Sequence, residues 1–437
     1  MTRDGQTVSA SFGHREKRLM LTRSCLAALL LVSSASAAGF SYPLFDGTTL
    51  SGWTIENNCK ADVGDDEIHL IDGNGWLRSD HQYGDFLMHV EWKAEKASKY
   101  DAGIYVRTQV GGSPFPRRGY QLNLAEGNEG ACGGLKGATP PPGLIKHGKW
   151  NSFDIIVVED TLSLAINGRP AYRASGMTID RGHIGIQVEG PSGGRMRFRN
   201  IQVTELGYTS LFNGRDLTGW EGAGQPSEIC WRVKRRKSRT NYSKLWSRAV
   251  ARYQKLGGDP TGIGALDEQT HDRGTIECSG ETGPWLRTTK QYGDFNLRFQ
   301  YQVSPGGNSG IYVRVPADGK HHRDNKTLPP AGFEVQVLDD NAKKYSKLKD
   351  YQYCGSVYAI AGATDRVCRP AGQWNTMEIN CTGQHITTIH NGVTIVDITP
   401  KSHPKLALRK LKGFLGLQNH STVVKFRRLR IGPAVTR

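Results

Sequence analysis

Two polar residues in the second half of the chain, Glu334 and Gln336, lie within the run Gly332-Phe-Glu-Val-Gln-Val-Leu-Asp339. In an extended strand, alternate side chains point to the same side, so this carboxyl and this amide share one face while the intervening valines point into a core. Such a strand suits a concave sugar-binding surface. Asp339 falls on the valine side by strict alternation, and a bulge after Gln336 would bring it onto the polar face.

Four more residues have side chains that suit a sugar site. Asn308 and Arg314 begin and end another extended run, and both can donate to sugar hydroxyls or to a carbonyl. His420 ends the run Gly416-Leu-Gln-Asn-His and can shuttle a proton or bind a metal. Tyr358 can stack on a sugar ring. Structural alternatives exist for three of them: Arg314 pairs with Glu334, His420 caps a turn and Tyr358 fills a core.

An internal repeat determines which elements position these residues. Gln82-Tyr-Gly-Asp-Phe86 returns intact as Gln291-Tyr-Gly-Asp-Phe295, and Gly103-Ile-Tyr-Val-Arg107 returns as Gly310-Ile-Tyr-Val-Arg314. Shorter landmarks recur in the same order: Leu50-Ser-Gly-Trp53 with Leu217-Thr-Gly-Trp220, Trp150-Asn151 with Trp374-Asn375, and Asn167-Gly168 with Asn391-Gly392. A fixed order over so many landmarks indicates a duplicated domain. We place the copies at residues 39–206 and 207–437.

Each copy is expected to be all-β. Apolar and polar residues alternate in runs such as Phe86-Leu-Met-His-Val-Glu-Trp92, and the chain has 53 glycines, which suit frequent turns. The Asn-Gly pairs are two-residue hairpin signals, because both residues tolerate positive φ. About a dozen short strands per copy predict a two-sheet antiparallel sandwich.

The second copy carries an insertion at about residues 232–258 that the first copy lacks. Arg232 to Lys255 contains ten Lys or Arg and no acid, which accounts for much of the net charge of +16. Leu245, Ala249, Tyr253 and Leu256 recur at helical spacing, opposite Lys244, Arg248, Arg252 and Lys255. The insertion is therefore a basic helix, expected to pack on the second sandwich. Its alternative role is a surface for acidic polymers or lipids.

The N-terminus resembles an export signal. Basic residues precede the apolar run Cys25-Leu-Ala-Ala-Leu-Leu-Leu-Val32, which is followed by Ala35-Ser-Ala37, a small-residue cleavage pattern. A short membrane anchor is the alternative. We therefore expect residues 1–38 to be a signal peptide and the mature protein to be periplasmic, cell-surface or extracellular. That location argues against nucleic acid as a partner.

Seven cysteines remain after the signal is removed, so at least one is free or pairs between chains. Cys230 and Cys278 flank the insertion and are placed to link its base, and Cys354 and Cys368 to brace one loop. No Cys-x-x-Cys spacing occurs, so the sequence supports no contiguous zinc or haem motif.

The landmarks of the second copy resemble the 3-keto-disaccharide hydrolase domain. The motifs that carry the resemblance are Leu211-Phe-Asn-Gly214 with Leu217-Thr-Gly-Trp220, Asn308-Ser-Gly-Ile-Tyr-Val-Arg314, Gly332 to Asp339, Gly372-Gln-Trp-Asn375, Leu417-Gln-Asn-His420 and Phe426-Arg427. The resemblance covers both copies and implies a concanavalin-like jelly roll that cleaves 3-keto-glycosides. Fold is inherited more safely than chemistry in such a comparison.

The first copy departs from this pattern at the polar positions. Gln121 stands where the second copy has Glu334, and Asn123 stands where it has Gln336. The other differences are Asp101 for Asn308, Lys136 for Tyr358 and Glu189 for His420, while Arg107 and Gln187 match Arg314 and Gln418. Losing the acid and the imidazole removes the obvious proton-transfer groups. We expect a binding or scaffold copy, although Asp101, Glu126 and Glu189 offer a rebuilt acidic site.

The leading hypothesis is an enzyme that cleaves oxidised glycosides. A ketone at C3 acidifies the C2 hydrogen, so the glycosidic oxygen can leave by β-elimination, followed by addition of water. Glu334 would be the base, His420 or Asp339 the acid, and Arg314 the stabiliser of the enediolate. A divalent metal held by Glu334, Asp339 or His420 would stabilise it equally well. The alternatives are a non-catalytic carbohydrate-binding protein, in which Asn308, Gln336, Tyr358, Gln418, Arg107, Gln121 and Asn123 bind sugar, and an adhesin acting through the basic helix.

Overall fold

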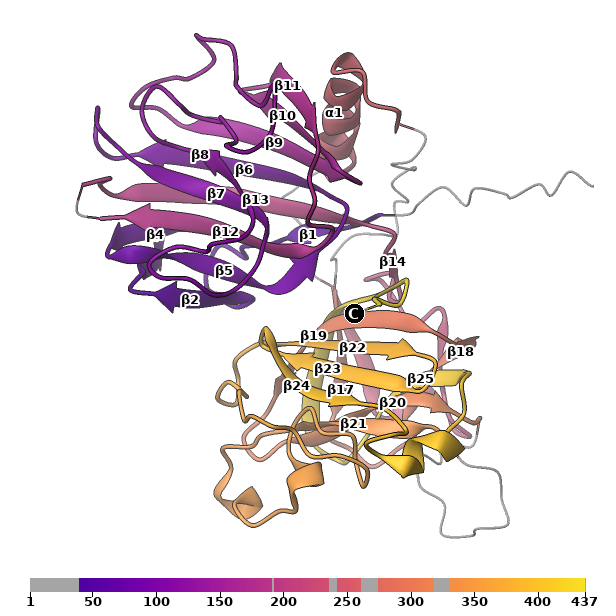
Figure 1. The fold of residues 1–437 in the computed structure, drawn as a ribbon. Helices are drawn as coiled ribbons and strands as arrows, with labels where there is room; N and C mark the ends of the chain where they lie inside the picture. The colour runs from indigo at the N-terminus through magenta and orange to yellow at the C-terminus, as the bar shows by residue number, and fades with distance from the viewer. Residues whose placement is uncertain (1–38, 191, 236–241, 261–273, 318–330, 437) are drawn as a thin grey trace, which may run out of the picture. The chain divides into compact units, whose positions relative to one another are not determined.

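A computed structural model describes residues 39–190, 192–235, 242–260, 274–317 and 331–436. Within Ser36–Arg437 the strands form two sandwiches, each made of an eight-stranded and a five-stranded sheet (Figure 1). The expected all-β class with two tandem sandwiches is therefore confirmed. The predicted signal peptide lies outside the described residues.

The first sandwich pairs its strands antiparallel throughout. Its larger sheet runs β11 (Arg169–Ser175), β10 (Thr161–Ile166), β9 (Asn151–Val158), β6 (Phe86–Ala94), β13 (Met196–Leu206), β4 (Glu67–Asp72) and β3 (Lys60–Gly64), with β1 (Gly39–Pro43) also on β13. Its smaller sheet runs β2 (Trp53–Asn57), β5 (Asn74–Tyr83), β12 (Gly182–Glu189), β7 (Ala102–Thr108) and β8 (Tyr120–Asn123).

The second sandwich repeats this arrangement strand for strand through its central elements. Its larger sheet runs β16 (Trp231–Arg235), β17 (Gly274–Ser279), β26 (Val423–Gly432), β19 (Phe295–Val303), β22 (Asn375–Thr382), β23 (His385–His390) and β24 (Val393–Ile398), with β14 (Thr209–Ser210) on β26. Its smaller sheet runs β15 (Trp220–Gly222), β18 (Leu286–Tyr292), β25 (Gly413–Leu417), β20 (Asn308–Val315) and β21 (Phe333–Leu338).

Alternation places the core between the two sheets of each sandwich. Trp92 and Phe153 are fully buried and meet edge to face, with ring centroids 5.6 Å apart. In the second sandwich Phe299 and Phe426 are also fully buried and lie with ring centroids 6.2 Å apart and ring planes tilted by 55°. Aromatic side chains thus lie in the core of each sandwich, but the Trp92–Phe153 pair is not repeated, because Tyr301 and Met377 take these two places in the second copy.

The two Asn-Gly hairpins form as the sequence predicts. Asn167 and Gly168 have φ values of 51° and 80°, and Asn391 and Gly392 have 46° and 80°. Two consecutive residues with positive φ make the turn whose twist matches the flanking strands. The hairpins join β10 to β11 and β23 to β24.

The predicted basic helix is present as α1 (Tyr242–Lys255), but its docking site was predicted wrongly. Tyr253 is buried against Leu87 of β6 and Ile156 of β9, so the apolar stripe packs on the first sandwich (Figure 1). Arg252, expected on the wet side, donates to Asp154 of β9. The outer face of β6 and β9 offers both an apolar patch and a buried carboxylate, and both attract this helix.

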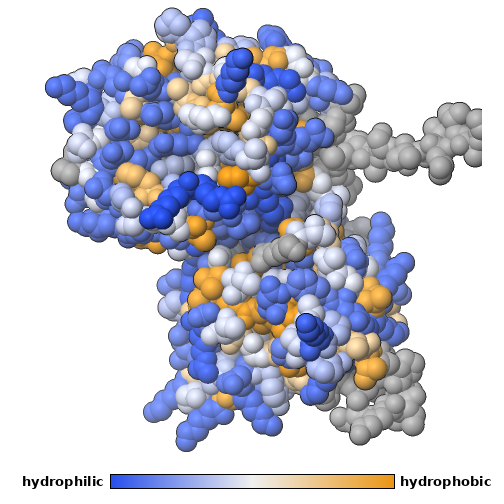
Figure 2. All heavy atoms as spheres, viewed as in Figure 1, coloured by the Kyte–Doolittle hydropathy of each residue, from blue (hydrophilic) through white to orange (hydrophobic). Residues whose placement is uncertain are grey.

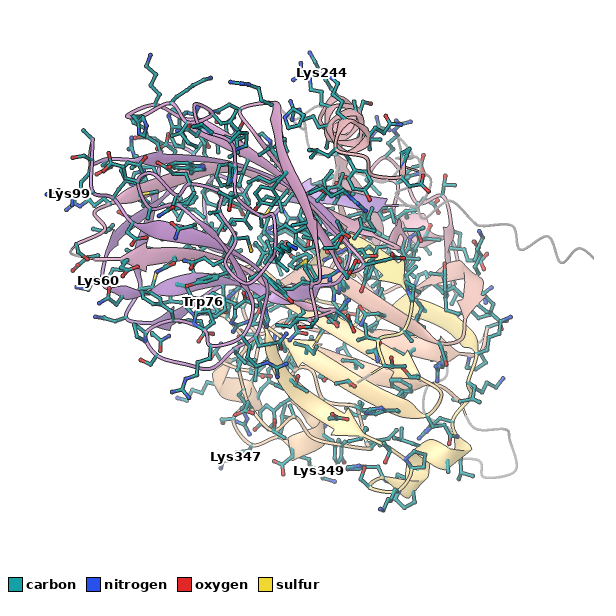
Figure 3. The ribbon with its side chains drawn as sticks, turned by 45° about the horizontal axis from the view of Figure 1, so that its top comes forward. Lys60, Trp76, Lys99, Lys244, Lys347 and Lys349 are labelled. Atoms are coloured by element: carbon teal, nitrogen blue, oxygen red, sulfur yellow. The ribbon has the colours of Figure 1, made fainter. Side chains whose placement is uncertain are left out.

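The remaining basic face of α1 is exposed. Lys244, labelled in Figure 3, projects away from the sandwich, and Arg248 and Lys255 are also exposed. On the face of the molecule drawn in Figure 2, hydrophilic residues predominate and hydrophobic ones are scattered in small groups. None of the described helices is both long enough and apolar enough to cross a membrane.

We predict that Tyr253→Ala releases α1 while both sandwiches stay folded. Truncating a buried aromatic side chain removes about 3 kcal/mol of packing free energy, and Tyr253 is the buried centre of the cluster that docks this helix. Hydrogen exchange of the α1 amides should rise strongly, whereas exchange in β9 should change little. The exposed Arg248→Ala is the control. Unchanged α1 exchange in the Tyr253 variant would show that other contacts hold the helix.

Candidate functional site

One face of the smaller sheet of the second sandwich collects the predicted polar residues. In the antiparallel register Gly310 lies opposite Gln336 and Tyr312 opposite Glu334, so these four share a face. The backbone N–H of Gln418 donates to Gly310 across from β25 (2.8 Å). A cavity of about 270 Å³ lies on this face. Its lining comprises Asn308, Glu334, Gln336, Leu338, Tyr345, Leu348, Gln352, Tyr358, Gln418 and His420.

Glu334 is the carboxylate of this cavity and is only 3 % exposed. The side-chain amide of Gln336 donates to Glu334 Oε1 (3.1 Å) and to the Ser309 carbonyl (3.0 Å). A Cβ on Gly310 would come within 2.2 Å of the Glu334 carboxylate, so the strand needs glycine there. The register, the amide and the missing side chain together hold this carboxylate in one place.

Gln418 presents an acceptor to the cavity. Its Nε2 donates to the Tyr312 hydroxyl (3.1 Å), and its buried Oε1 has no hydrogen-bond partner among the described residues. Burial, reinforced by the negative charge of Glu334, raises the pKa of Tyr312, so this phenol stays protonated. A buried acceptor without a partner is costly unless a ligand hydroxyl or water reaches it. The cavity is therefore suited to a polyhydroxylated ligand.

His420 and Tyr358 complete the cavity from two different segments. His420 follows β25 and is exposed, so its imidazole lies at the rim. Tyr358 is half-buried, its N–H donates to the Glu334 carbonyl (2.9 Å), and its ring meets Tyr351 edge to face. The structure brings together the predicted Asn308, Glu334, Gln336, Tyr358, Gln418 and His420.

The loop between β21 and β22 contributes residues that sequence reasoning missed. Tyr345, Leu348 and Gln352 line the cavity, and Gln352 Nε2 donates to the Tyr358 hydroxyl (3.3 Å). Lys347 and Lys349, labelled in Figure 3, lie on the same exposed loop. The loop has no strand alternation from which side-chain directions could be predicted. The only signal in the sequence was that a tyrosine and an amide, Tyr345 and Gln352, lie shortly before Tyr358.

Arg314 lies outside this cavity, which corrects the predicted role of enediolate stabiliser. Its φ is 52°, and the register with β25 shifts between Tyr312 and Val315. This bulge turns its side chain away from the Tyr312 face. The buried guanidinium donates to the carbonyls of Gly293 (2.9 Å) and Gly383 (2.5 Å) and to the Asp294 carboxylate (2.9 Å).

Arg107 makes the equivalent contacts in the first sandwich and is likewise no sugar ligand. Its φ is 46°, and it donates to the carbonyls of Gly84 (3.0 Å) and Glu159 (2.5 Å) and to Asp85 (2.7 Å). The alternative that Arg314 pairs with Glu334 is wrong, because its carboxylate partner is Asp294, the aspartate of the repeated Tyr-Gly-Asp motif, as Asp85 is for Arg107.

Asp339 also points elsewhere, because β21 has no bulge through Leu338. Its Oδ2 accepts the N–H of Gly306 (2.8 Å) and its Oδ1 the N–H of Asn341 (3.3 Å), so it stabilises two turns. Asp339 is therefore neither the catalytic acid nor a ligand in the cavity. Among the described residues, Glu334, Asp339 and His420 do not form a group of ligand atoms close enough to share a metal ion.

The first sandwich has its own cavity at the equivalent place, of about 630 Å³. Gln121, Asn123 and Gln187 line it, and the Gln121 amide donates to Gln187 Oε1. Gln187 in turn donates to Glu189 (2.9 Å). The cavity thus keeps the amides of the second copy, and Glu126 lies outside its lining.

Two carboxyl groups, Asp101 and Glu189, line the same cavity and titrate abnormally. Burial, followed by the negative charge of Asp101, raises the pKa of Glu189, and burial raises the pKa of Asp101. Arg117 and Arg118 also line this cavity. Two neighbouring carboxyl groups can accept hydrogen bonds from the hydroxyls of a neutral ligand.

Comparison with known proteins shows that both copies belong to one domain family. The family model of the 3-keto-alpha-glucoside-1,2-lyase-like domain matches residues 41–204 and again 207–432. A 3-keto-disaccharide hydrolase of Bacteroides thetaiotaomicron is 26 % identical over 264 residues, covering 53 % of this chain and 80 % of the relative.

Solved structures are similar over about half of the chain or less. A glycosyl hydrolase candidate of Parabacteroides distasonis aligns at 23 % identity, with a TM-score of 0.35, over 52 % of this chain and 98 % of its own. The carbohydrate-binding module CBM66 of Bacillus subtilis aligns at 15 % identity, with a TM-score of 0.28, over 36 % and 97 %.

We predict that Arg314→Met and Arg107→Met each lower the free energy of unfolding, by about 2 kcal/mol, because buried acceptors lose their donor. Urea denaturation measures this. The protein that remains folded should bind sugar with unchanged affinity in either variant. A loss of sugar binding in Arg314→Met alone, with normal stability, would return this arginine to the site.

Proposed function

Because the chain belongs to the family of 3-keto-alpha-glucoside-1,2-lyase-like domains, we propose that its second sandwich cleaves the glycosidic bond of 3-keto-glycosides. One observation carries the proposal: a buried carboxylate, Glu334, shares a cavity with four side-chain amides and a rim imidazole. A purely lectin-like site needs the amides and aromatic rings but not a carboxylate and an imidazole as a pair.

The proposed reaction is an elimination across C1 and C2. The Glu334 carboxylate takes the proton from C2, which the C3 ketone acidifies, and the electron pair of that C–H bond forms the C1=C2 bond. The C1–O bond breaks, and His420 gives a proton to the departing alkoxide. Water then adds across the double bond, its hydroxyl to C1 and its hydrogen to C2, which releases the 3-keto sugar. General acid and base groups at these positions typically supply about 10²–10⁴-fold each.

We assign the stabilisation of the enediolate, first predicted for Arg314, to a side-chain amide. Negative charge develops on the C3 oxygen as the C2 proton leaves, so donors are needed on that oxygen. Asn308 lines the cavity beside Glu334 and its side-chain amide carries such donors, whereas the Gln336 amide already donates to Glu334 and Ser309. The acceptor Oε1 of Gln418 would orient a neighbouring sugar hydroxyl. A divalent cation held by Glu334 and His420 is the alternative stabiliser, and Asp339 no longer belongs to that set.

We propose a binding role for the first sandwich. Gln121 and Glu189 replace Glu334 and His420 there, so its cavity lacks the same base and acid. The larger cavity and its amides suit a longer carbohydrate, with cleavage at the second copy. The expected signal peptide would place this activity outside the cytoplasm, where such substrates enter from the surroundings.

We predict that Glu334→Gln lowers kcat for a 3-keto-glucoside by at least about 100-fold, because it removes the base but keeps the shape of the side chain. Release of the aglycone measures the rate, and circular dichroism checks the fold. Gln121→Glu is the matched control and should create no activity in the first cavity, because Glu189 still occupies the position of the imidazole. Full activity of Glu334→Gln would leave the carbohydrate-binding function as the better account.

We predict that Gln187→Ala weakens carbohydrate binding in the first cavity by about tenfold, the effect of one or two hydrogen bonds. Calorimetry with an oligosaccharide on the Glu334→Gln background isolates binding from turnover. The kcat for a small 3-keto-glucoside should stay at the value of the parent protein. A parallel loss of kcat would show that the first cavity takes part in cleavage.

A further inference from the structure

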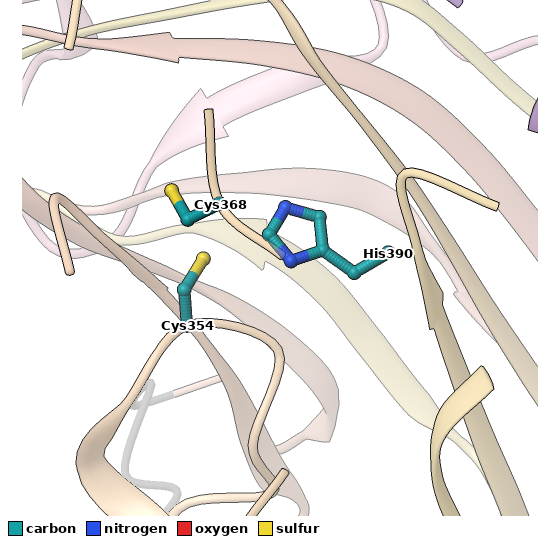
Figure 4. A group of neighbouring side chains, drawn as sticks. All are labelled: Cys354, Cys368 and His390. Atoms are coloured by element: carbon teal, nitrogen blue, oxygen red, sulfur yellow. The ribbon is translucent and has the colours of Figure 1, made fainter. Parts of the chain in front are cut away.

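A group of metal-ligating side chains lies in the second sandwich, apart from the cavity residues. The ligand atoms of Cys354, Cys368 and His390 all lie within 4.8 Å of one another (Figure 4). Cys354 and Cys368 come from the loop between β21 and β22, and His390 ends β23. No local motif predicts this group, because the three residues are spread over 37 positions, from 354 to 390.

A fourth polar atom, the hydroxyl of Tyr301, lies among these ligand atoms. It is 2.9 Å from Cys354 Sγ, 3.7 Å from Cys368 Sγ and 2.9 Å from His390 Nε2. Tyr301, Cys354 and His390 are at most 1 % exposed. Four N, O and S atoms separated by these distances approach the corners of a tetrahedron around a small cation, whose bonds to them are about 2.0–2.3 Å.

The first sandwich shows that the fold does not require polar residues here. Trp92 occupies the place of Tyr301, since they pair with Asn151 and Asn375 respectively. Ile166 precedes the hairpin asparagine as His390 does. Ile145 matches Cys368, because each directly precedes a residue whose N–H donates to the equivalent asparagine of its own copy, Asn151 or Asn375. Only the cysteine is kept, as Cys132.

The cysteine sulfurs have both backbone donors and backbone acceptors near them, the acceptors being the carbonyls of Gln336 (3.5 Å) for Cys354 and of Leu338 and Arg369 (3.4 Å each) for Cys368. The N–H of Leu338 donates to Cys354 Sγ (3.4 Å), and the N–H of Cys354 donates to the Asp340 carboxylate (2.9 Å). Backbone donors to sulfur and outer carboxylates are the usual supports of metal-bound side chains. His390 Nδ1 is buried and has no hydrogen-bond partner among the described residues.

We propose that Cys354, Cys368, His390 and the Tyr301 hydroxyl bind one zinc ion in a closed, structural site. Two sulfurs, one imidazole nitrogen and one oxygen match the ligand preference of Zn²⁺. A disulfide between the two cysteines would account for the sulfurs alone and would leave a buried imidazole and phenol that the first sandwich does without.

The site would act on the loop that forms one wall of the candidate cavity. Cys354 and Cys368 flank Tyr358, and Gln352 precedes them on the same loop. A zinc ion bound by these two cysteines and by His390 would link the loop to β23 of the larger sheet. The zinc would therefore hold Tyr358 and Gln352 over Glu334 without touching the substrate.

The test is metal content and spectroscopy of the full protein. Protein dialysed against a weak chelator should keep about one Zn²⁺ per chain by mass spectrometry of the elements, and protein produced with Co²⁺ should show the visible absorption of a tetrahedral thiolate site. The variant combining Cys368→Ile with His390→Ile takes its residues from the first sandwich, so it should fold yet bind less than a tenth of the metal. Cys132→Ser is the control and should keep the full amount.

Two results would overturn the proposal. One is a metal content in the parent protein no higher than that of the double variant. The other is a Cys354–Cys368 disulfide detected by peptide mass spectrometry of the natively purified, alkylated protein. Both measurements are made on the parent chain, so they decide the matter even if the double variant fails to fold.

Discussion

In each sandwich, one buried arginine with a left-handed backbone conformation ties the strand that bears it to two neighbouring turns. Arg314 links β20 to the turn before β19 through Gly293 and Asp294, and to the turn after β22 through Gly383. The backbone of β25 passes so close that a Cβ on Gly413 would lie 2.3 Å from the Arg314 carbonyl carbon. Both sheets of the sandwich are therefore fixed to one guanidinium, which explains why this motif is repeated intact.

The contacts of this arginine are shared by the two copies, whereas the side chains on the polar face differ between them. Arg107 has the corresponding contacts and the corresponding positive φ, so both copies present strands in one register. On that common face the side chains are free to vary. Gln121 and Glu334 both lie opposite the tyrosine of the repeated motif, and both sit over a glycine whose Cβ would meet them at 2.2 Å. A change from amide to acid at this one position therefore alters chemistry while leaving the scaffold as it was.

Strand alternation predicted much of the site, and each of the failures has a physical cause. Glu334 and Gln336 lie within one regular strand, so period-two reasoning placed them correctly. The prediction for Arg314 was wrong because its positive φ interrupts the alternation, and the sequence contains no residue that indicates this bulge. Asp339 lies one residue beyond its strand, where turn hydrogen bonds decide its direction. For α1 the period identified the apolar stripe, but nothing in the helix itself specifies which sandwich offers Leu87, Ile156 and Asp154.

Comparison of the copies supplies information that neither copy contains alone. At a core position, a tyrosine or histidine is easily taken for an ordinary packed residue, since proteins bury both. In this chain the partner copy fills the same places with Trp92 and Ile166 and folds into the same sandwich. Burial of polar groups has a desolvation cost, and the scaffold does not demand Tyr301 and His390, which hydrogen-bond to each other at 2.9 Å. Their presence beside two cysteine sulfurs points to a ligand within the second copy, the copy whose adjoining loop carries Tyr358 to the carboxylate.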